Sequence, residues 1–451
     1  MINEEHVQDI IATPNIFIII LIVSLLDGID IVLNKTITIF TLIMTSIGFS
    51  LILATRIMVE LSSRQIYRLR IKRKILDPAI ENNPIRVKII VENKSIIPLP
   101  KITLNDIYPG LFRKIHGYNR ITTFILPGEK IEFTYVISPV LGTHEFKGIE
   151  IIVSDPLNLF NYKTIVNPEQ KIVMVKPRPI TMPKKLSLIY TQRGLGVGKA
   201  RMKGIGQEFY DLREYVPGDD YRFIDWKSYA RLRKLYIKEF EREANLSIIF
   251  IINATTESMR GLLGETPLEY MTRLVAGLSN ILIKRGDWVG VVIRSDKTLR
   301  SGYGRGIRHY YRIINTLSMI KWGKHKPIQT LEDTILREAI LLPRRTKTLF
   351  FVLTSSLNPS EVDEIVRAYH KLLSYNHIMY IVYLVPELFE KKALKGIDAG
   401  IYSAFIYEKL TSTIDISRLF LKKGIRTVSV GPDDIYISVY GLIEKYRAVI
   451  T

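Results

Sequence analysis

The stretch from Phe209 to Arg231 contains the residue types best suited to recognition chemistry. Arginines alternate there with carboxylates and aromatic rings around the turn-forming residues Pro217 and Gly218. A planar guanidinium pairs with a carboxylate through two parallel hydrogen bonds and also stacks on aromatic rings. The pattern therefore indicates an internal network of ion pairs that fixes a long loop against the next domain, or a docking surface for an acidic partner.

The residues that we expect to bind a partner are spread along this stretch. They are Arg213, Tyr215, Asp219, Asp220, Arg222, Asp225, Trp226 and Arg231. Aromatic rings interleaved with Arg also suit single-stranded nucleic acid, but nearby carboxylates would repel phosphates, so nucleic acid is the weaker alternative. No histidine accompanies Asp219 and Asp225, so we expect neither a catalytic carboxylate pair nor an enzyme.

The elements after this stretch alternate between strand and helix. A continuous apolar run typical of a buried parallel strand lies at Leu246–Ile252, and further strands are expected at Trp288–Ile293, Thr348–Leu353, Ile378–Leu384 and Ile425–Val430. Helical spacing is found at Pro267–Arg285, Ile307–Ile320, Ser360–Leu373 and Ile435–Tyr446. This alternation predicts a doubly wound α/β sheet over 246–451, whose ligands would lie beyond the carboxyl ends of the strands. Arg300–His309, rich in Gly and Arg, is expected to be a basic loop.

Short alternating runs precede the Arg-Asp stretch. Examples are Ile85–Val91, Ile131–Val136 and Glu145–Val153, with turn-forming residues between them. Several short strands with frequent turns predict an all-β sandwich of the immunoglobulin-like kind over 75–176. Its lone histidines suggest no chemistry, so we expect this domain to space, dock or bind.

The beginning of the chain is strongly apolar, at Ile10–Leu26 and Thr36–Val59. A membrane span needs about 20 apolar residues. The second run is long enough, whereas the first needs to extend to Leu33. We predict a transmembrane hairpin over 1–62, with Asp27–Lys35 as a tight loop. Buried core helices and a cleaved signal peptide are the alternatives, although the acidic leader argues against a signal peptide.

Basic residues follow the second run, namely Arg64, Arg68, Arg70, Lys72, Arg73 and Lys74. Positive residues stay on the cytoplasmic side of a membrane and contact anionic lipid headgroups. We therefore expect two spans in the cell membrane, with the bulk of the chain cytoplasmic. The basic residues after the second run account for part of the formal net charge of +20. A local net charge of +8 lies between Lys171 and Ala244. The chain has no cysteine, which excludes disulfides and thiolate chemistry.

The Arg-Asp stretch closely resembles the signature of the family known as domain of unknown function 58 (DUF 58), F-x-x-x-R-x-Y-x-x-G-D-D-x-R-x-I-D-W-x-x-x-A-R. The matching residues are Phe209, Arg213, Tyr215, Gly218, Asp219, Asp220, Arg222, Ile224, Asp225, Trp226, Ala230 and Arg231. The run Asp155–Phe160 also resembles the family's D-P-x-x-L-F. The resemblance implies two membrane helices, a β domain, a Gly/Arg-rich signature segment at 177–245 and a von Willebrand factor A-like domain at 246–451. It also implies a MoxR-type AAA+ ATPase, or the client of one, as the partner of a membrane-anchored scaffold or adaptor.

Von Willebrand factor A-like domains often hold a divalent cation at the carboxyl edge of the sheet, so the resemblance implies a candidate ligand set. The positions here are Asn253, Thr255, Glu257, Ser258 and Thr354. Asn253 stands where the pattern has a carboxylate, and a neutral set of oxygens binds Mg²⁺ weakly. We therefore expect no resident cofactor and a degenerate site kept for fold or docking. A metal-dependent adhesion or sensing module is the alternative.

Overall fold

The computed structural model describes residues 10–34, 38–169, 171–180, 201–243, 245–323, 327–343, 346–356, 358–391 and 417–450. Contacts divide the chain into two units, Met1–Val175 and Lys176–Thr451, and each is described by itself. Part of the predicted signature segment, residues 181–200, lies outside the described ranges.

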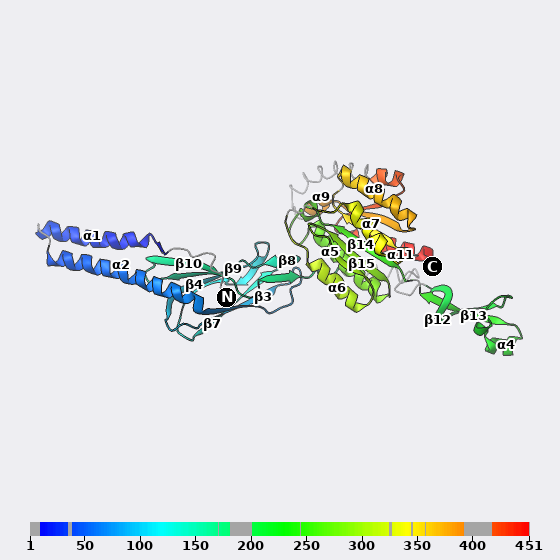
Figure 1. The fold of residues 1–451 in the computed structure, drawn as a ribbon, viewed down its shortest axis with the longest axis horizontal. Helices are drawn as coiled ribbons and strands as arrows, with labels where there is room; N and C mark the ends of the chain where they lie inside the picture. Colours follow the sequence, from blue (N-terminus) through cyan, green and yellow to red (C-terminus); the bar gives the residue numbers. More distant parts are fainter. Residues whose placement is uncertain are drawn as a thin grey trace. The chain divides into compact units, whose positions relative to one another are not determined.

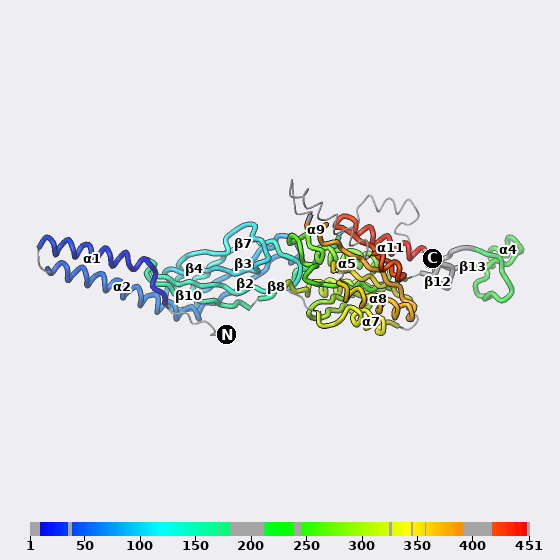
Figure 2. The backbone as a smooth tube through the Cα atoms, turned by 90° about the horizontal axis from the view of Figure 1, so that it is seen from above, coloured from blue at the N-terminus to red at the C-terminus, as the bar shows by residue number. Residues whose placement is uncertain are grey.

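Two long apolar helices, α1 (Asn15–Asn34) and α2 (Ile39–Gln65), run side by side in both views (Figures 1 and 2). Both are long and apolar enough to cross a membrane, which agrees with the predicted hairpin. The predicted loop at Asp27–Lys35 is wrong, because α1 continues through Asp30 to Asn34. Its 20 residues give a length of roughly 30 Å, enough for a full span.

Small residues on α2 allow the two helices to approach closely. Thr41, Gly48 and Thr55 recur every seventh residue and are all buried. A Cβ at Gly48 would lie 2.9 Å from Val23 Cγ2 on α1. Close packing through small residues is the usual way in which helices associate inside a membrane.

The β domain holds both ends of the helical hairpin. The short strand β1 (Ile11–Ala12) precedes α1 and pairs with β10 (Phe160–Val166). At the other end, α2 packs against β10, and the Arg56 guanidinium lies 5.9 Å from the centre of the Phe160 ring. Residues of α2 from Arg56 onward therefore belong with the β domain, and the apolar turns before them are those available to lipid.

Two antiparallel sheets form the body of the β domain. One has the order β1-β10-β9-β4-β6 and the other the order β2-β3-β7-β5, with β11-β8 as a separate pair. The strands not yet given are β2 (Leu69–Ile75), β3 (Ile85–Asn93), β4 (Leu99–Ile107), β5 (Arg113–Gly117), β6 (Arg120–Ile125), β7 (Lys130–Ser138), β8 (Gly142–Glu145), β9 (Gly148–Ser154) and β11 (Ile172–Val175). The sheet thus begins at Leu69 rather than at 75. An immunoglobulin-like strand order stays a prediction.

A buried ion pair joins the two sheets. Arg73 on β2 pairs with Asp106 on β4, and both side chains are fully buried. Asp106 also accepts a hydrogen bond from the Tyr135 hydroxyl, and the Arg73 guanidinium lies 4.3 Å from the centre of the Phe146 ring. The basic run after α2 is therefore not uniformly available to lipid, since Arg73 points into the domain.

The second unit contains a six-stranded sheet with the order β16-β15-β14-β17-β18-β19. Its strands are β14 (Ser247–Asn253), β15 (Trp288–Arg294), β16 (Leu299–Gly304), β17 (Leu349–Thr354), β18 (Ile378–Leu384) and β19 (Arg426–Val430). All neighbours pair in parallel except β15 and β16, which are antiparallel. The predicted doubly wound α/β sheet is thus observed.

Helices cover both faces of this sheet, as Figure 1 shows. They are α5 (Pro267–Lys284), α6 (Ile307–Ser318), α7 (Leu331–Leu341), α8 (Pro359–Ser374), α9 (Pro386–Lys391) and α11 (Ile435–Ile450). Ile248 and Phe250 face α5, α6 and α11, whereas Ile249 and Ile251 face α7 and α8. Burial on both faces explains why β14 is apolar throughout.

The predicted basic loop at Arg300–His309 is wrong. Its first half is strand β16, and α6 begins at Ile307. Arg300 donates to Glu338 on α7 at 2.6 Å, and the Arg305 guanidinium lies 5.1 Å from the Trp288 ring centre. Glycines that favour a loop are tolerated here because β16 is an edge strand.

Candidate functional site

The signature forms a β-hairpin with a structured tip. Strands β12 (Arg201–Glu214) and β13 (Tyr236–Glu243) pair antiparallel, and we call residues 215–235 the tip. The tip contains the 3₁₀ turn η2 (Tyr221–Phe223) and the short helix α4 (Trp226–Leu232). Its base is closed by backbone hydrogen bonds from Tyr215 N to Leu235 O, at 3.0 Å, and from Asp225 N to Tyr236 O, at 2.8 Å.

A glycine-dependent turn opens the tip. Asp219 N donates to Val216 O at 3.1 Å across Pro217 and Gly218. Gly218 has φ of +108°, a conformation that residues with a side chain rarely adopt. Proline before glycine is the pattern of a type II turn. This turn places Asp219 opposite the end of β12.

The first two carboxylates of the tip are held by arginines. Arg213 binds Asp219 through both terminal nitrogens, at 2.6 and 2.7 Å, and Arg222 Nη2 lies 2.7 Å from Asp220. These hydrogen bonds hold the pKa of Asp219 and that of Asp220 below the usual range. The ion-pair network predicted from the sequence is therefore present inside the hairpin, and its role in fixing the loop against the next domain stays a prediction.

The third carboxylate, Asp225, fixes the start of α4. Ser228 Oγ donates to Asp225 Oδ2 at 2.6 Å, and Lys238 Nζ on β13 lies 3.1 Å from Oδ1. The hydrogen bond from Ser228, followed by that from Lys238, lowers the pKa of Asp225. Asp225 is buried and internally bonded, so it shapes the tip rather than contacting a ligand.

Apolar and aromatic side chains point outward from the tip. Tyr221 is 73% exposed and Trp226 is 63% exposed, and Leu232 and Val216 are also well exposed. The rings of Trp226 and Tyr229 meet edge to face, with centres 6.3 Å apart. Large exposed aromatic side chains on a rigid loop are typical anchors of protein interfaces.

The cations of the tip outnumber the carboxylates available to them. Glu214, Asp219, Asp220 and Asp225 each have a basic partner. Lys227, Arg231 and Arg233 are exposed and form no ion pair among the described residues. The exposed face of α4 therefore combines aromatic rings with uncompensated positive charge.

The structure divides the predicted partner-binding residues into two groups. Arg213, Asp219, Asp220, Arg222 and Asp225 form ion pairs inside the hairpin, although Arg222 is itself 75% exposed. Trp226 and Arg231 are exposed, and Tyr215 is half-buried with its backbone N–H bonded to Leu235 O. Sequence reasoning missed the exposed Tyr221, Lys227, Leu232 and Arg233. The sequence signal that could have found them is the order of residue types after Asp225. In a helix that begins there, Lys227 and Arg231 are one turn apart and therefore neighbours on the helix surface.

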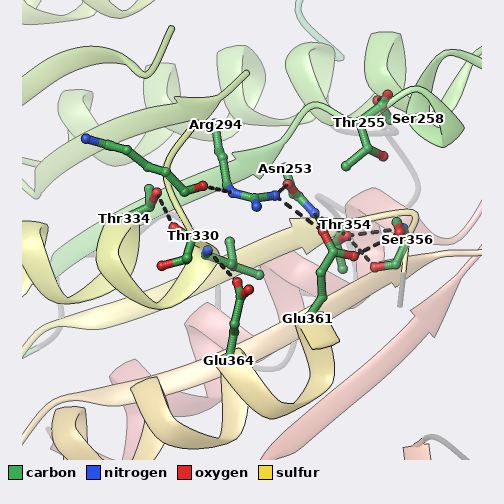
Figure 3. A network of polar contacts seen from close by, with 12 residues as sticks. Asn253, Thr255, Ser258, Arg294, Thr330, Thr334, Thr354, Ser356, Glu361 and Glu364 are labelled. Carbon is green, nitrogen blue, oxygen red and sulfur yellow. Dashed lines mark hydrogen bonds and ion pairs between the residues drawn. The ribbon is translucent and has the colours of Figure 1, made fainter. Parts of the chain in front are cut away.

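A second polar cluster lies at the carboxyl edge of the α/β sheet (Figure 3). Asn253, Arg294 and Thr354 are the last residues of β14, β15 and β17, and Glu361 lies in the first turn of α8. With Ser356 they form what we call the carboxyl-edge cluster. After β14 the chain adds β15 and β16 on one side of this strand and then β17, β18 and β19 on the other. The point between β14 and β17 is therefore the switch point of the strand order, where doubly wound sheets bind ligands.

The carboxyl-edge cluster is held together by internal hydrogen bonds. Arg294 Nη1 donates to Asn253 Oδ1 at 2.8 Å and lies 3.3 Å from Glu361 Oε1. Asn253 Nδ2 donates to Thr354 Oγ1 at 3.1 Å and to Glu361 Oε1 at 3.2 Å, and Ser356 Oγ donates to Glu361 Oε2 at 2.9 Å. Every member has at least one partner within the cluster.

The predicted metal ligands do not form a metal site. Asn253 and Thr354 lie together and Asn253 contacts Glu361 directly, while the Arg294 guanidinium contacts both Asn253 and Glu361. Ser258 Oγ donates to Thr255 O at 2.6 Å, while Thr255 Oγ1 is buried without a hydrogen-bond partner. Within the described residues, no three His, Asp or Glu side chains group as metal ligands. A fixed cation beside Asn253 and Glu361 does not fit a divalent ion.

The match to the family confirms the resemblance seen in the signature. Residues 211–377 match the family described as "Protein of unknown function DUF58". No curated protein matches the chain at a significant level. The match covers the end of β12, the tip and the first half of the α/β unit.

Solved structures resemble the chain only weakly. The VWA domain of SpRpn10 is 12% identical with a TM-score of 0.27, covering 42% of this chain and 89% of that one. The conserved hypothetical protein BatB from Bacteroides thetaiotaomicron is 12% identical with a TM-score of 0.24, covering 31% and 67%. A GH20 exo-β-N-acetylglucosaminidase from Vibrio harveyi is 9% identical with a TM-score of 0.17, covering 71% and 57%. At these TM-scores none of them defines the fold or the function of this chain.

Proposed function

We propose that this protein is a membrane-anchored adaptor, not an enzyme, which presents the tip of its signature hairpin to a protein partner. The observation that carries the proposal is the tip itself. The ion pairs of Asp219, Asp220 and Asp225 hold its shape, and it displays exposed aromatic and apolar side chains beside cations that have no ion-pair partner among the described residues. Such a surface gains binding energy by burying aromatic rings, with little loss of conformational freedom.

The partner surface that suits the tip is acidic with an apolar pocket. Lys227, Arg231 and Arg233 would attract carboxylates, while Trp226 and Leu232 would be buried against apolar groups. The family resemblance suggests a MoxR-type AAA+ ATPase or its client as that partner. It likewise favours a von Willebrand factor A-like assignment for the α/β unit.

The apolar hairpin would fix the adaptor in the bilayer. The outward faces of α1 and α2 are rich in exposed Ile and Leu. Exposed basic residues follow α2 at Arg70, Lys72 and Lys74, which favours a cytoplasmic position for both units. Because the chain lacks cysteine, Lys227→Cys provides a single label site for testing this orientation. We expect an impermeant maleimide to label it in inverted vesicles and not in intact cells.

The binding test uses the full chain in nanodiscs and a purified MoxR-type AAA+ ATPase from the same organism. Trp226→Ala should weaken binding at least about tenfold, as expected of a central aromatic anchor. Arg231→Glu should also weaken binding, and more strongly at low salt than at high salt, because this substitution reverses the charge of an exposed cation. Unchanged affinity for both variants would contradict the proposed use of the tip.

A matched control lies on α6. Tyr311 is 59% exposed, and Tyr311→Ala removes a similar aromatic surface outside the tip. It should leave ATPase binding unchanged. If the wild-type chain instead binds single-stranded oligonucleotides through Trp226, with affinity that falls steeply with salt, the tip is a nucleic-acid site and the adaptor proposal fails.

A further inference from the structure

The Arg294 guanidinium lies at the degenerate metal site that the family resemblance implies. It stands at the end of β15, beside Asn253 on the adjacent β14, with which it is in register. Its side chain is only 9% exposed. A guanidinium is always charged at physiological pH, so this edge of the sheet holds a cation that depends on no bound ion, and the Glu361 carboxylate balances its charge from 3.3 Å.

The Arg294 side chain is held from three directions. Nε donates to the backbone oxygen of Gln329 at 2.9 Å, and Nη1 contacts Asn253 and Glu361. Nη2 makes no hydrogen bond within the parts of the chain that the structure describes. Two N–H groups of a nearly buried, rigidly positioned cation therefore remain available to an acceptor.

The negative charge of Glu361 is satisfied by groups other than an outside ligand. Its oxygens accept from Asn253, Arg294 and Ser356. It also lies in the first turn of α8, where the helix dipole favours a carboxylate. Arg294 thus retains donor capacity after Glu361 has been saturated.

Two further hydroxyls near these strand ends have no partner among the described residues. Thr255 Oγ1 and Ser355 Oγ are both buried and form no hydrogen bond there. Thr255 follows β14 by two residues and Ser355 directly follows β17, so both belong to the edge that contains Asn253 and Thr354. The Nη2 group of Arg294 is the charged donor at this edge, and it suits an anionic acceptor.

We propose that the carboxyl edge of the α/β unit is a metal-independent carboxylate-binding site, in which Arg294 replaces a divalent cation and offers Nη2 to the ligand. The ligand is either the side chain of an acidic peptide segment or a free small carboxylate. This site is separate from the hairpin tip, so the proposal stands or falls independently of the adaptor function.

The first test asks whether the edge binds a metal. Full-length protein in detergent is titrated with Mn²⁺, and free Mn²⁺ is followed by electron paramagnetic resonance. The wild type should bind no Mn²⁺, whereas the double variant Arg294→Met with Asn253→Asp should bind one equivalent, because the cation is removed and a carboxylate is added. Mn²⁺ binding by the wild type that is lost in Thr354→Val would overturn the proposal.

The second test asks whether the edge binds a carboxylate. Thermal unfolding is compared in sodium acetate and sodium chloride at equal ionic strength, and then with a Glu-containing peptide and its Gln counterpart. Acetate should raise the unfolding temperature of the wild type but not of Arg294→Met, and EDTA should change neither result. A preference for the Glu peptide over acetate would identify the acidic segment as the ligand, and the reverse a small carboxylate.

A folding defect must be separated from a binding defect. Arg294→Lys keeps the positive charge but loses the paired N–H donors of the planar guanidinium. This variant should fold, and acetate should raise its unfolding temperature less than that of the wild type. An equal acetate effect in the wild type, Arg294→Lys and Arg294→Met would overturn the carboxylate site.

Discussion

Arginine–aspartate pairs occur in two very different surroundings in this protein. Arg73 and Asp106 are fully buried between the sheets of the β domain, whereas Arg213 and Asp219 are 38% and 21% exposed in the hairpin tip. The two pairs consist of the same chemical groups, but only the Arg213–Asp219 pair is in contact with water. Breaking a buried pair leaves an uncompensated charge in a low-dielectric interior, while water screens the loss of an exposed pair.

The difference separates residues that hold the fold from residues that shape a surface. Removing one partner of the buried pair should destabilise the β domain. The tip pairs contribute little to global stability, so their effect is to hold α4 and its exposed side chains in one arrangement. Variants of the two pairs should therefore separate stability from partner binding.

The largest effect is expected from Asp106→Ala. This change leaves the buried Arg73 without its carboxylate and should lower the free energy of unfolding by about 3–5 kcal/mol. Chemical unfolding of the full chain in detergent measures it. Tyr135→Phe removes only one hydrogen bond to Asp106 and should cost about 1 kcal/mol. Equal losses for the two variants would show that Arg73 finds another partner.

The next effect concerns the helical hairpin. Gly48→Leu forces a side chain against Val23, which should destabilise the helix pair by about 1–3 kcal/mol. Gly28→Leu on α1 is the matched control, since a Cβ there meets nothing within 4 Å. Cross-linking of Cys residues introduced at the ends of the two helices reports the pairing. Equal cross-linking in both variants would contradict the observed packing.

As the pH falls, the buried histidine of the β domain should affect stability at a higher pH than the carboxylates of the tip do. Burial lowers the pKa of His144, whose Nε2 lies 2.9 Å from Val140 O. The folded state keeps this ring neutral, whereas the unfolded chain takes up a proton near pH 6.5. Stability is therefore complete above that pH and falls as the pH drops through it. Unfolding midpoints between pH 7 and pH 5 should fall less steeply in His144→Gln than in the wild type.

The smallest effect on stability is expected from Asp219→Asn in the tip. The unfolding temperature should hardly change, while partner binding weakens because Arg213 no longer fixes the turn. Asp77→Asn is a matched control, because Asp77 forms an exposed pair with Arg86 at 2.7 Å in the β domain, and this pair lowers the Asp77 pKa to about 2. Asp77→Asn should change neither property. Reduced binding in both variants would remove the special role of the tip.

Much of the fold could be predicted because local patterns decide it. Continuous apolar runs predicted β14, β15, β17 and β18, since strands buried on both faces leave no polar positions, whereas the half-exposed edge strand β19 followed from the alternation of strands and helices. Two apolar stretches predicted α1 and α2. The edge strand β16 was missed because its glycines and arginines have the composition of a loop, and only pairing with β15 makes it a strand.

The candidate sites could be predicted only in part. The Arg-Asp network of the tip follows from residue types at short spacing, and Arg213 and Asp219 are only six positions apart. The Arg294–Asn253–Glu361 cluster has no such local signal, because its members are separated by 41 to 108 positions. A sequence pattern that contained only oxygen-bearing residues could not show that a distant arginine completes it.

The sequence by itself determined the apolar hairpin, the alternation of strands and helices, the family signature and the absence of thiol chemistry, because each depends on composition or on neighbours within a few residues. Only the tertiary structure decided which charges are paired. It turned Arg73 into the β domain, left Lys227, Arg231 and Arg233 without a carboxylate partner among the described residues, and placed Arg294 at the degenerate metal site. Charge pairing depends on distances between residues far apart in the chain, and these are set when the sheets and helices pack.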